Sequence, residues 1–343
     1  MTAMSMHSVR RIVRDSAFPM GDVLRTVRVR TPSTVTLAGG ERSIIGSGWA
    51  TGAVVVSAAV LAAWAYGGGA YVQTLVGLFA AYLVAALGYN VVLGNAGQFA
   101  FCQNAFMAIG AYGFAVTQPH LGAVLGIVVG AGAATLAGTV IGVSIIRTRE
   151  IYLALLTLAF SQAALLAIQL WRPTQGDNGI LALLGGDNAY LIALVGAAIS
   201  VLLVQRVLRS KVGTAFALVR TDEKAAAAMG INVPVARTLA FAFSSLLGGI
   251  GGVLLAGMLT FVTPTNFTLE LTLLLLTMIV IGGVGSVWGT VVGVAIMVLI
   301  QQFLPGSGST GSYIDAALLF VILATRPAGL RSLVALRSGT HRG

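Results

Sequence analysis

The stretch from Tyr71 to Leu93 reads YVQTLVGLFAAYLVAALGYNVVL, and it lies inside a longer stretch, Ser43 to Ile146, that contains no Asp, Glu, Lys or Arg. A transmembrane helix needs about 20 consecutive apolar residues. The charge-free stretch therefore has room for four spans joined by tight turns. We place them at Trp49 to Tyr66, Tyr71 to Leu93, Phe99 to Thr117 and Leu121 to Ile146.

Further apolar segments follow, at Ile151 to Trp171, Ala189 to Leu208, Leu239 to Val262, Leu269 to Ile281, Val287 to Leu304 and Tyr313 to Thr325. Hydrophobic residues make up 57% of the chain and charged residues 9%, and the mean hydropathy is +0.94. Soluble domains carry about 25% charged residues. The 44 glycines are typical of helices that pack closely in lipid. The sequence thus predicts an all-α integral membrane protein, a polytopic bundle of about ten transmembrane helices.

The basic residues indicate the orientation of the chain. Lys and Arg gather in short cytoplasmic segments, and with ten spans only Arg172 of the 20 basic residues falls on the outer side. We therefore expect both termini in the cytoplasm. Membrane orientation explains the net charge of +10, so no nucleic-acid binding is predicted. The basic residues are expected to contact anionic membrane lipids. The acidic residues of the outer loops form either a docking surface or a solvated rim; they are Asp177, Asp187, Glu270 and Asp315.

We divide the chain into an Arg-rich cytoplasmic tail (1–48), a transmembrane domain (49–325) with a cytoplasmic loop at 209–237, and a cytoplasmic C-terminal tail (326–343). The N-terminal tail has no apolar core of a cleavable signal. Cys102 is the only cysteine, which rules out an internal disulfide. The three histidines are scattered, so neither a metal site nor a catalytic triad is predicted.

The segment Arg220-Thr-Asp-Glu-Lys-Ala-Ala-Ala-Ala-Met-Gly-Ile231 predicts a short helix in the cytoplasmic loop. Thr221 can cap this helix, and Asp222 and Glu223 place negative charge at its first turn. Gly230 can end it.

Between these ends, the alanines from Ala225 to Ala228 favour helix but offer little side-chain surface. A helix this short is marginal alone. We expect it to dock against a partner whose backbone can approach the small side chains; a solvated helical loop is the alternative.

Two interruptions break the apolar pattern. The first, Leu93 to Tyr112, contains Gln98, Gln103 and Asn104 within apolar sequence. Buried amides need partners, so these side chains either join helices or line a polar path. We take them as candidates for a translocation path, together with Tyr112 and, on the fifth span, Gln162 and Gln169. The second interruption, Ile281-Gly-Gly-Val-Gly-Ser-Val-Trp-Gly289, permits a tight turn or a broken helix.

Three motifs resemble those of the permease subunits of ATP-binding cassette (ABC) importers for branched-chain amino acids, a family related to permeases for urea and short amides. They are Gly94-Asn-Ala-Gly-Gln98 with Gly110-Ala-Tyr112, Glu223-Lys-Ala-Ala-Ala-Ala-Met-Gly-Ile231, and Ile281 to Gly289. The resemblance runs from about Gly77 to about Gly329. It makes these glycines structural: Gly94, Gly97, Gly110, Gly282, Gly283, Gly285 and Gly289.

The resemblance implies a cytoplasmic coupling helix that contacts a separate ATPase through Glu223, Ala225, Ala226 and Gly230, with Arg220 and Asp222 beside them. It also implies a second permease chain, identical or related, an extracytoplasmic binding protein and a location in the plasma membrane, the inner membrane of a bacterium. The sequence has no P-loop. We therefore expect a transport subunit rather than an enzyme, without a cofactor of its own, whose ATPase partners use ATP and Mg²⁺.

The sequence differs from the family pattern in two places, and the second difference affects the prediction of the substrate. The Arg-rich N-terminus is atypical, and Asn95 stands where an aromatic residue is common. The substrate is left open among branched-chain amino acids, other amino acids, urea and amides. An ion-coupled secondary transporter is the rival reading, but such proteins generally keep ionisable residues inside their spans, and the spans before Ile146 have none.

Overall fold

The computed structural model describes residues 47–145, 150–171, 174 and 179–303, which belong to one compact unit that begins at Ser47. The predicted span Tyr313 to Thr325, both predicted tails, Arg172, Asp177 and Asp315 lie outside the described residues. The first helices are α3 (Ser47–Gly67), α4 (Gly69–Asn90), the π-helical turn η1 (Val91–Asn95), α5 (Gln103–Ile145) and α6 (Glu150–Leu170). They are followed by η4 (Gly186–Asn188), α7 (Ala189–Arg209), α8 (Lys211–Thr221), α9 (Glu223–Ala228), α10 (Val233–Leu259), η5 (Pro264–Phe267), α11 (Leu269–Gly282) and α12 (Val287–Phe303).

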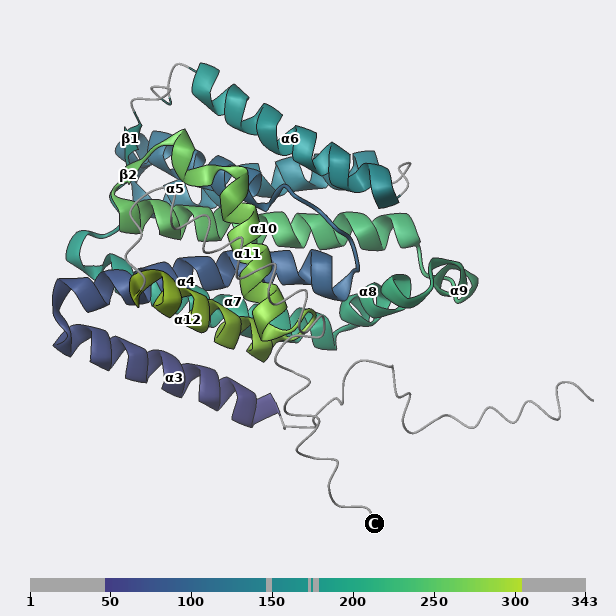
Figure 1. Cartoon of the computed structure of the whole chain (residues 1–343), viewed down its shortest axis with the longest axis horizontal. Helices are drawn as coiled ribbons and strands as arrows, with labels where there is room; N and C mark the ends of the chain where they lie inside the picture. The colour runs from purple at the N-terminus through teal and green to yellow at the C-terminus, as the bar shows by residue number, and fades with distance from the viewer. Residues whose placement is uncertain (1–46, 146–149, 172–173, 175–178, 304–343) are drawn as a thin grey trace, which may run out of the picture. The chain divides into compact units, whose positions relative to one another are not determined.

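The all-α fold class is confirmed, because long apolar helices make up nearly all of the described structure (Figure 1). Six helical segments in the described ranges are long and apolar enough to cross a membrane: Gly69–Asn95, Gln103–Ser144, Tyr152–Leu170, Ala189–Arg209, Val233–Leu259 and Pro264–Gly282. Two shorter apolar segments lie in α3 and α12. The predicted number of about ten spans is not confirmed by these helices.

The helix α5 is two helical arms joined at a sharp bend. The backbone at Gly122 has φ 82° and ψ 170°, far from helical values, and Pro119 lies just before it. The arms lie against each other, because a methyl group placed on Gly130 would be 2.4 Å from the carbonyl oxygen of Gly110. The chain therefore reverses here, as the two predicted spans Phe99 to Thr117 and Leu121 to Ile146 require.

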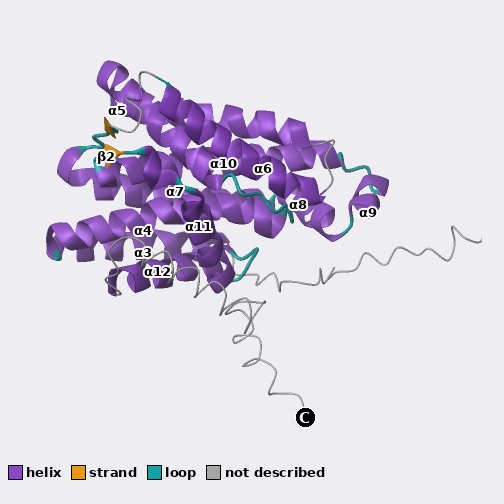
Figure 2. Ribbon diagram, turned by 45° about the horizontal axis from the view of Figure 1, so that its top comes forward, coloured by secondary structure: helices purple, strands orange, loops and turns teal. Residues whose placement is uncertain are grey.

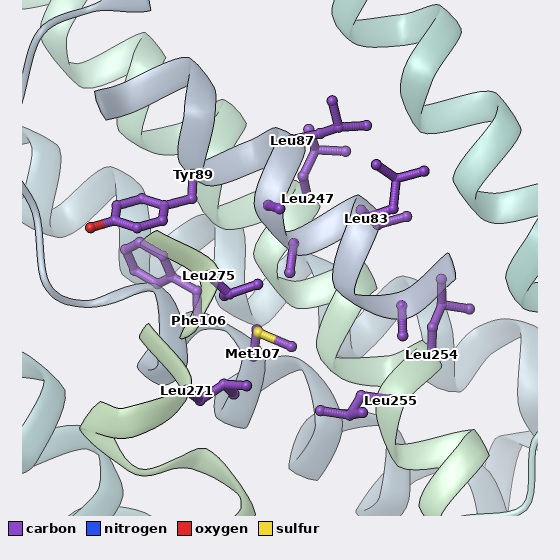
Figure 3. Packing of buried hydrophobic residues seen from close by; sticks show 14 of the residues in the cluster. Leu83, Leu87, Tyr89, Phe106, Met107, Leu247, Leu254, Leu255, Leu271 and Leu275 are labelled. Carbon is purple, nitrogen blue, oxygen red and sulfur yellow. The ribbon is translucent and has the colours of Figure 1, made fainter. Parts of the chain in front are cut away.

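The hydrophobic core lies where α4, α5, α10 and α11 meet. Figure 3 shows Leu83 and Leu87 of α4 among Leu247 and Leu254 of α10, with Met107 of α5 nearby. All of these side chains are 4% exposed or less. The tightest contacts involve backbone rather than side chains: a methyl group on Gly110 of α5 would lie 2.3 Å from the carbonyl oxygen of Gly249 of α10. Glycine is required here because any side chain would force the two helices apart.

The two ends of the bundle differ. At one end, β1 (Ile180–Leu181) pairs antiparallel with β2 (Phe261–Val262). At the other end, α8 and α9 extend beyond the long helices, as both views show (Figures 1 and 2). The helix α9 is thus carried outside the apolar bundle, between α8 and the start of α10.

We predict that Gly110→Ala destabilises the protein, whereas Gly132→Ala does not. The first methyl group meets the backbone of Gly249, while the second meets no atom within 4 Å although it lies on the same helix. Forcing an extra methyl group into a packed contact costs about 1–3 kcal/mol. The melting temperature of the detergent-purified protein measures the difference, and equal melting temperatures for the two variants would show that α5 and α10 are not in close contact.

Candidate functional site

The helix α9 begins at a cap that differs by one residue from the prediction. Asp222 has extended backbone angles, and its Oδ1 accepts hydrogen bonds from the amides of Lys224 (2.8 Å) and Ala225 (3.2 Å). Thr221 was predicted as the cap, and this is wrong. Its hydroxyl instead donates to the carbonyl oxygen of Ala217 at 2.9 Å, because α8 continues through Thr221.

The other end of α9 follows the prediction. Gly230 has φ 82°, a left-handed conformation that glycine adopts without strain. The amide of Gly230 donates to the carbonyl oxygen of Ala227 and that of Ile231 to Ala226, which together form a Schellman motif. Asn232 then caps α10 by accepting from the amide of Val235 at 3.2 Å.

Most of α9 faces outward. Ala226 is fully buried, whereas Ala225, Ala227 and Ala228 are exposed and Met229 is 61% exposed. These exposed side chains form a shallow apolar surface that a partner can approach closely.

The charged residues assigned to the coupling segment point in different directions. Glu223 forms an ion pair with Arg237, which ties α9 to α10. The guanidinium group of Arg220 donates from Nη1 to the carbonyl oxygen of Gly94, far away in the sequence. Asp222 is exposed beside the outward surface, and Arg220 is also exposed although its guanidinium group makes this hydrogen bond.

Both predicted interruptions are real breaks in helices. After η1, residues 96–102 are not helical, and Gly97 has φ 71°. Between α11 and α12, Gly283 has φ 101° and Gly285 has φ 84°. The breaks touch, because a methyl group on Gly285 would lie 3.1 Å from the carbonyl oxygen of Gly94. Two of the three motifs that carry the family resemblance therefore meet at Gly94 and Gly285, and Arg220, which precedes the third motif, reaches the same place.

Asn90 links the two breaks, and the sequence analysis missed it. Its Oδ1 accepts from the amide of Gly285 at 2.8 Å, and its Nδ2 donates to Thr290 Oγ1 at 3.0 Å and to the carbonyl oxygen of Ser286 at 3.3 Å. A single amide near the end of an apolar run is the signal that would have singled it out.

Two of the predicted path residues are used to join helices. Nε2 of Gln103 donates to the carbonyl oxygen of Ala85 at 3.0 Å, and its Oε1 accepts from Ser244 at 3.1 Å. Asn104 donates from Nδ2 to the carbonyl oxygen of Phe267 at 2.9 Å. Its Oδ1 accepts from Ser161 and Thr272.

Tyr112 is also buried, with its hydroxyl 3.4 Å from the carbonyl oxygen of Val262 and its ring edge against Phe267. The alternative in which the amides join helices thus describes Gln103 and Asn104, while Tyr112 bonds to the strand β2.

Gln98 differs from these residues. It is 4% exposed, yet neither its Nε2 nor its Oε1 has a hydrogen-bond partner among the described residues. Gln162 and Gln169 of α6 are exposed, unlike Gln98. A buried amide without a partner is costly in an apolar environment. Gln98 is therefore the path candidate whose donor and acceptor are still available to a substrate.

The long apolar helices, with two glycine breaks among them, are those of a multi-pass membrane protein. Comparison with known sequences gives the family. The chain belongs to the family described as branched-chain amino acid transport system / permease component, whose sequence profile matches residues 71–325. The predicted resemblance is confirmed.

Two relatives show how far the similarity extends. The chain is 28% identical over 305 residues to the high-affinity branched-chain amino acid transport system permease protein LivM of Escherichia coli (strain K12), covering 76% of this chain and 71% of the relative. The protein of the same name from Salmonella typhimurium (strain LT2) is 27% identical over 307 residues, with the same shares covered. No solved structure matches the chain.

We predict that Asn104→Ala lowers the melting temperature of the purified protein, because it leaves Ser161, Thr272 and the carbonyl group of Phe267 without their shared partner. Each buried polar group left unpaired costs about 1–3 kcal/mol. Gln162→Ala is the matched control, since that amide is exposed, and we expect it to leave the melting temperature unchanged. A stable Asn104→Ala protein would contradict the interhelical role.

Proposed function

We propose that this chain is the membrane-spanning subunit of an ABC importer that moves branched-chain amino acids inward across the plasma membrane, the inner membrane of a bacterium. It would work with separate ATPase subunits, which use ATP and Mg²⁺, with a second permease chain and with an extracytoplasmic binding protein. Both termini and α9 would face the cytoplasm. The names of the LivM relatives support the transport system and the substrate class.

The observation that carries the proposal is the construction of α9. It is capped at both ends, held to α10 by the Glu223–Arg237 ion pair and presents small side chains outward at one end of the bundle. A helix of six residues gains little stability alone. Such a rigid, shallow surface fits into a groove of a partner, and the flanking helices α8 and α10 would carry the movement of that partner into the membrane.

Gln98 is our leading candidate for contact with the substrate. A zwitterionic amino acid needs dipoles for both its charges and an apolar wall for its side chain, and an amide supplies a donor and an acceptor without a net charge. A neutral contact favours weak and transient binding. This suits an importer whose binding protein supplies the affinity. A urea or short-amide permease would use the same amide chemistry, so the transport assays below include urea and acetamide.

An ion-coupled secondary transporter is the less favoured function. Such transporters place ionisable side chains within their spans. Within the described residues, Glu270 lies in the first turn of α11, and Asp222 and Glu223 lie beyond the bundle.

We predict that Gly230→Val prevents docking of the ATPase. Valine is strained at φ 82°, so the end of α9 should unwind while the spans remain intact. Co-purification of the ATPase from membranes that contain the complete transporter, together with uptake of radiolabelled leucine, measures the effect. We expect both to fall roughly tenfold, within the range of coupling between sites.

Gly69→Val is the control for this variant. Gly69 has φ 76° and, like Gly230, has no atom within 4 Å of an added methyl group, but it is the first residue of α4, at the turn that follows α3. Normal docking in Gly230→Val, or equal loss in both variants, would refute the assignment of α9.

We predict that Gln98→Leu lowers uptake several-fold while the complex still assembles. The substitution removes an amide that has no hydrogen-bond partner among the described residues, so the melting temperature should not fall. Gln103→Leu, in contrast, breaks two hydrogen bonds and should lower it. Uptake of leucine, urea and acetamide by the Gln98 variant tests the role, and unchanged uptake of all three would remove Gln98 from the path.

A further inference from the structure

Arg220 occupies the point where the docking segment meets the broken spans. It lies in the last turn of α8, just before Asp222 caps α9. The residue is exposed, and its Nη1 donates to the carbonyl oxygen of Gly94 in η1. Arg220 therefore joins the segment that would receive force from a partner to a break inside the bundle.

The contact has a clear physical basis. The last carbonyl groups of a helix have no partner within that helix, and this end carries the negative end of the helix dipole. A guanidinium group supplies both a donor and a positive charge. Here the helix that ends is α4 with its continuation η1, and the cation comes from α8.

Arg220 also lies against Gly97 and Gly285, one glycine from each break. A methyl group on Gly97 would lie 2.8 Å from Cγ of Arg220, so the backbone of the first break packs on the aliphatic part of this side chain. A methyl group on Gly285 would lie 3.3 Å from Nη1, so the second break approaches the guanidinium group. One side chain thus touches both breaks.

We propose that Arg220 is a positioning residue that transmits movement of the docking helix to the two breaks, rather than a contact to the ATPase. This proposal rests on the proposed function. Displacement of α8 changes the position of the guanidinium group relative to Gly94 and Gly285. Gln98, which lies directly after Gly97 and is buried without a hydrogen-bond partner among the described residues, then moves with the first break.

The test uses the complete transporter reconstituted in lipid vesicles, with Arg220→Met compared with Lys211→Met. Methionine keeps an apolar stem but removes the charge and the donors. Lys211 is the exposed cation at the opposite end of α8. We expect Arg220→Met to bind its ATPase and hydrolyse ATP like the unaltered protein, but to import about tenfold less leucine per ATP. Lys211→Met should match the unaltered protein, and Arg220→Lys, which keeps the charge, should recover part of the transport.

A second readout needs no transport. Cys102 is buried at the end of the first break, immediately before α5, and it is the only cysteine of the chain. The rate at which N-ethylmaleimide alkylates Cys102 is measured on the peptide of this chain that contains Cys102. This rate should change about fivefold or more when the ATPase is trapped with ATP and vanadate. We expect this change in the unaltered protein and in Lys211→Met, and its absence in Arg220→Met.

Several results would overturn the proposal. Arg220→Met that loses its ATPase while Lys211→Met keeps it would place Arg220 on the docking surface. Normal import by Arg220→Met would remove the link. The link would also be refuted, without any variant, if Cys102 of the unaltered protein were alkylated at the same rate with and without trapped nucleotide. If the unaltered chain binds no ATPase, the proposed function fails, and the link through Arg220 fails with it.

Discussion

Hydrocarbon offers no hydrogen bonds to a polypeptide, so a helix that is interrupted within a membrane must find partners for its freed backbone groups inside the protein. The described structure meets this demand with individual side chains. Arg220 bonds the carbonyl group of Gly94, Asn90 accepts from the amide of Gly285, and Asn104 bonds the carbonyl group of Phe267. The positions of the breaks, and hence of every helix that follows one, depend on these few contacts.

The same contacts also hold together parts of the chain that are distant in sequence. Asn90 lies 195 positions before Gly285, and Gln103 lies 141 positions before Ser244. Each polar side chain that forms a hydrogen bond to the backbone at a break, or to a buried amide, thereby fixes which helices are neighbours. The apolar core around Leu87, Met107 and Leu254 supplies contact area without direction, whereas the polar contacts select one arrangement (Figure 3).

The sequence predicted well what depends on local chemistry. Apolar runs located the helices, and Gly230 ended α9 as expected. Pro119 lies in the gap between the third and fourth predicted spans, whereas the bend at Gly122 falls on the second residue of the predicted fourth span. The cap of α9 was predicted at Thr221, whereas the structure has it at Asp222. Nothing in the sequence shows that α8 extends to Thr221. Hydropathy alone did not separate Gln98 from Gln103 and Asn104. The partners of those two residues come from other helices, so only the fold shows which amide is left unpaired.

The glycines of α10 bring its backbone into close contact with α5. Gly249 faces the backbone of α5 at Ala131, and Gly252 approaches the carbonyl oxygen of Met107 so closely that a methyl group would lie 2.0 Å from it. Backbones in such contact leave no room for one helix to move toward the other. The 27 residues of α10 extend about 40 Å, and this helix starts beside α9. Any displacement of α10 at Gly249 or Gly252 must therefore displace α5 as well, because the two helices touch there.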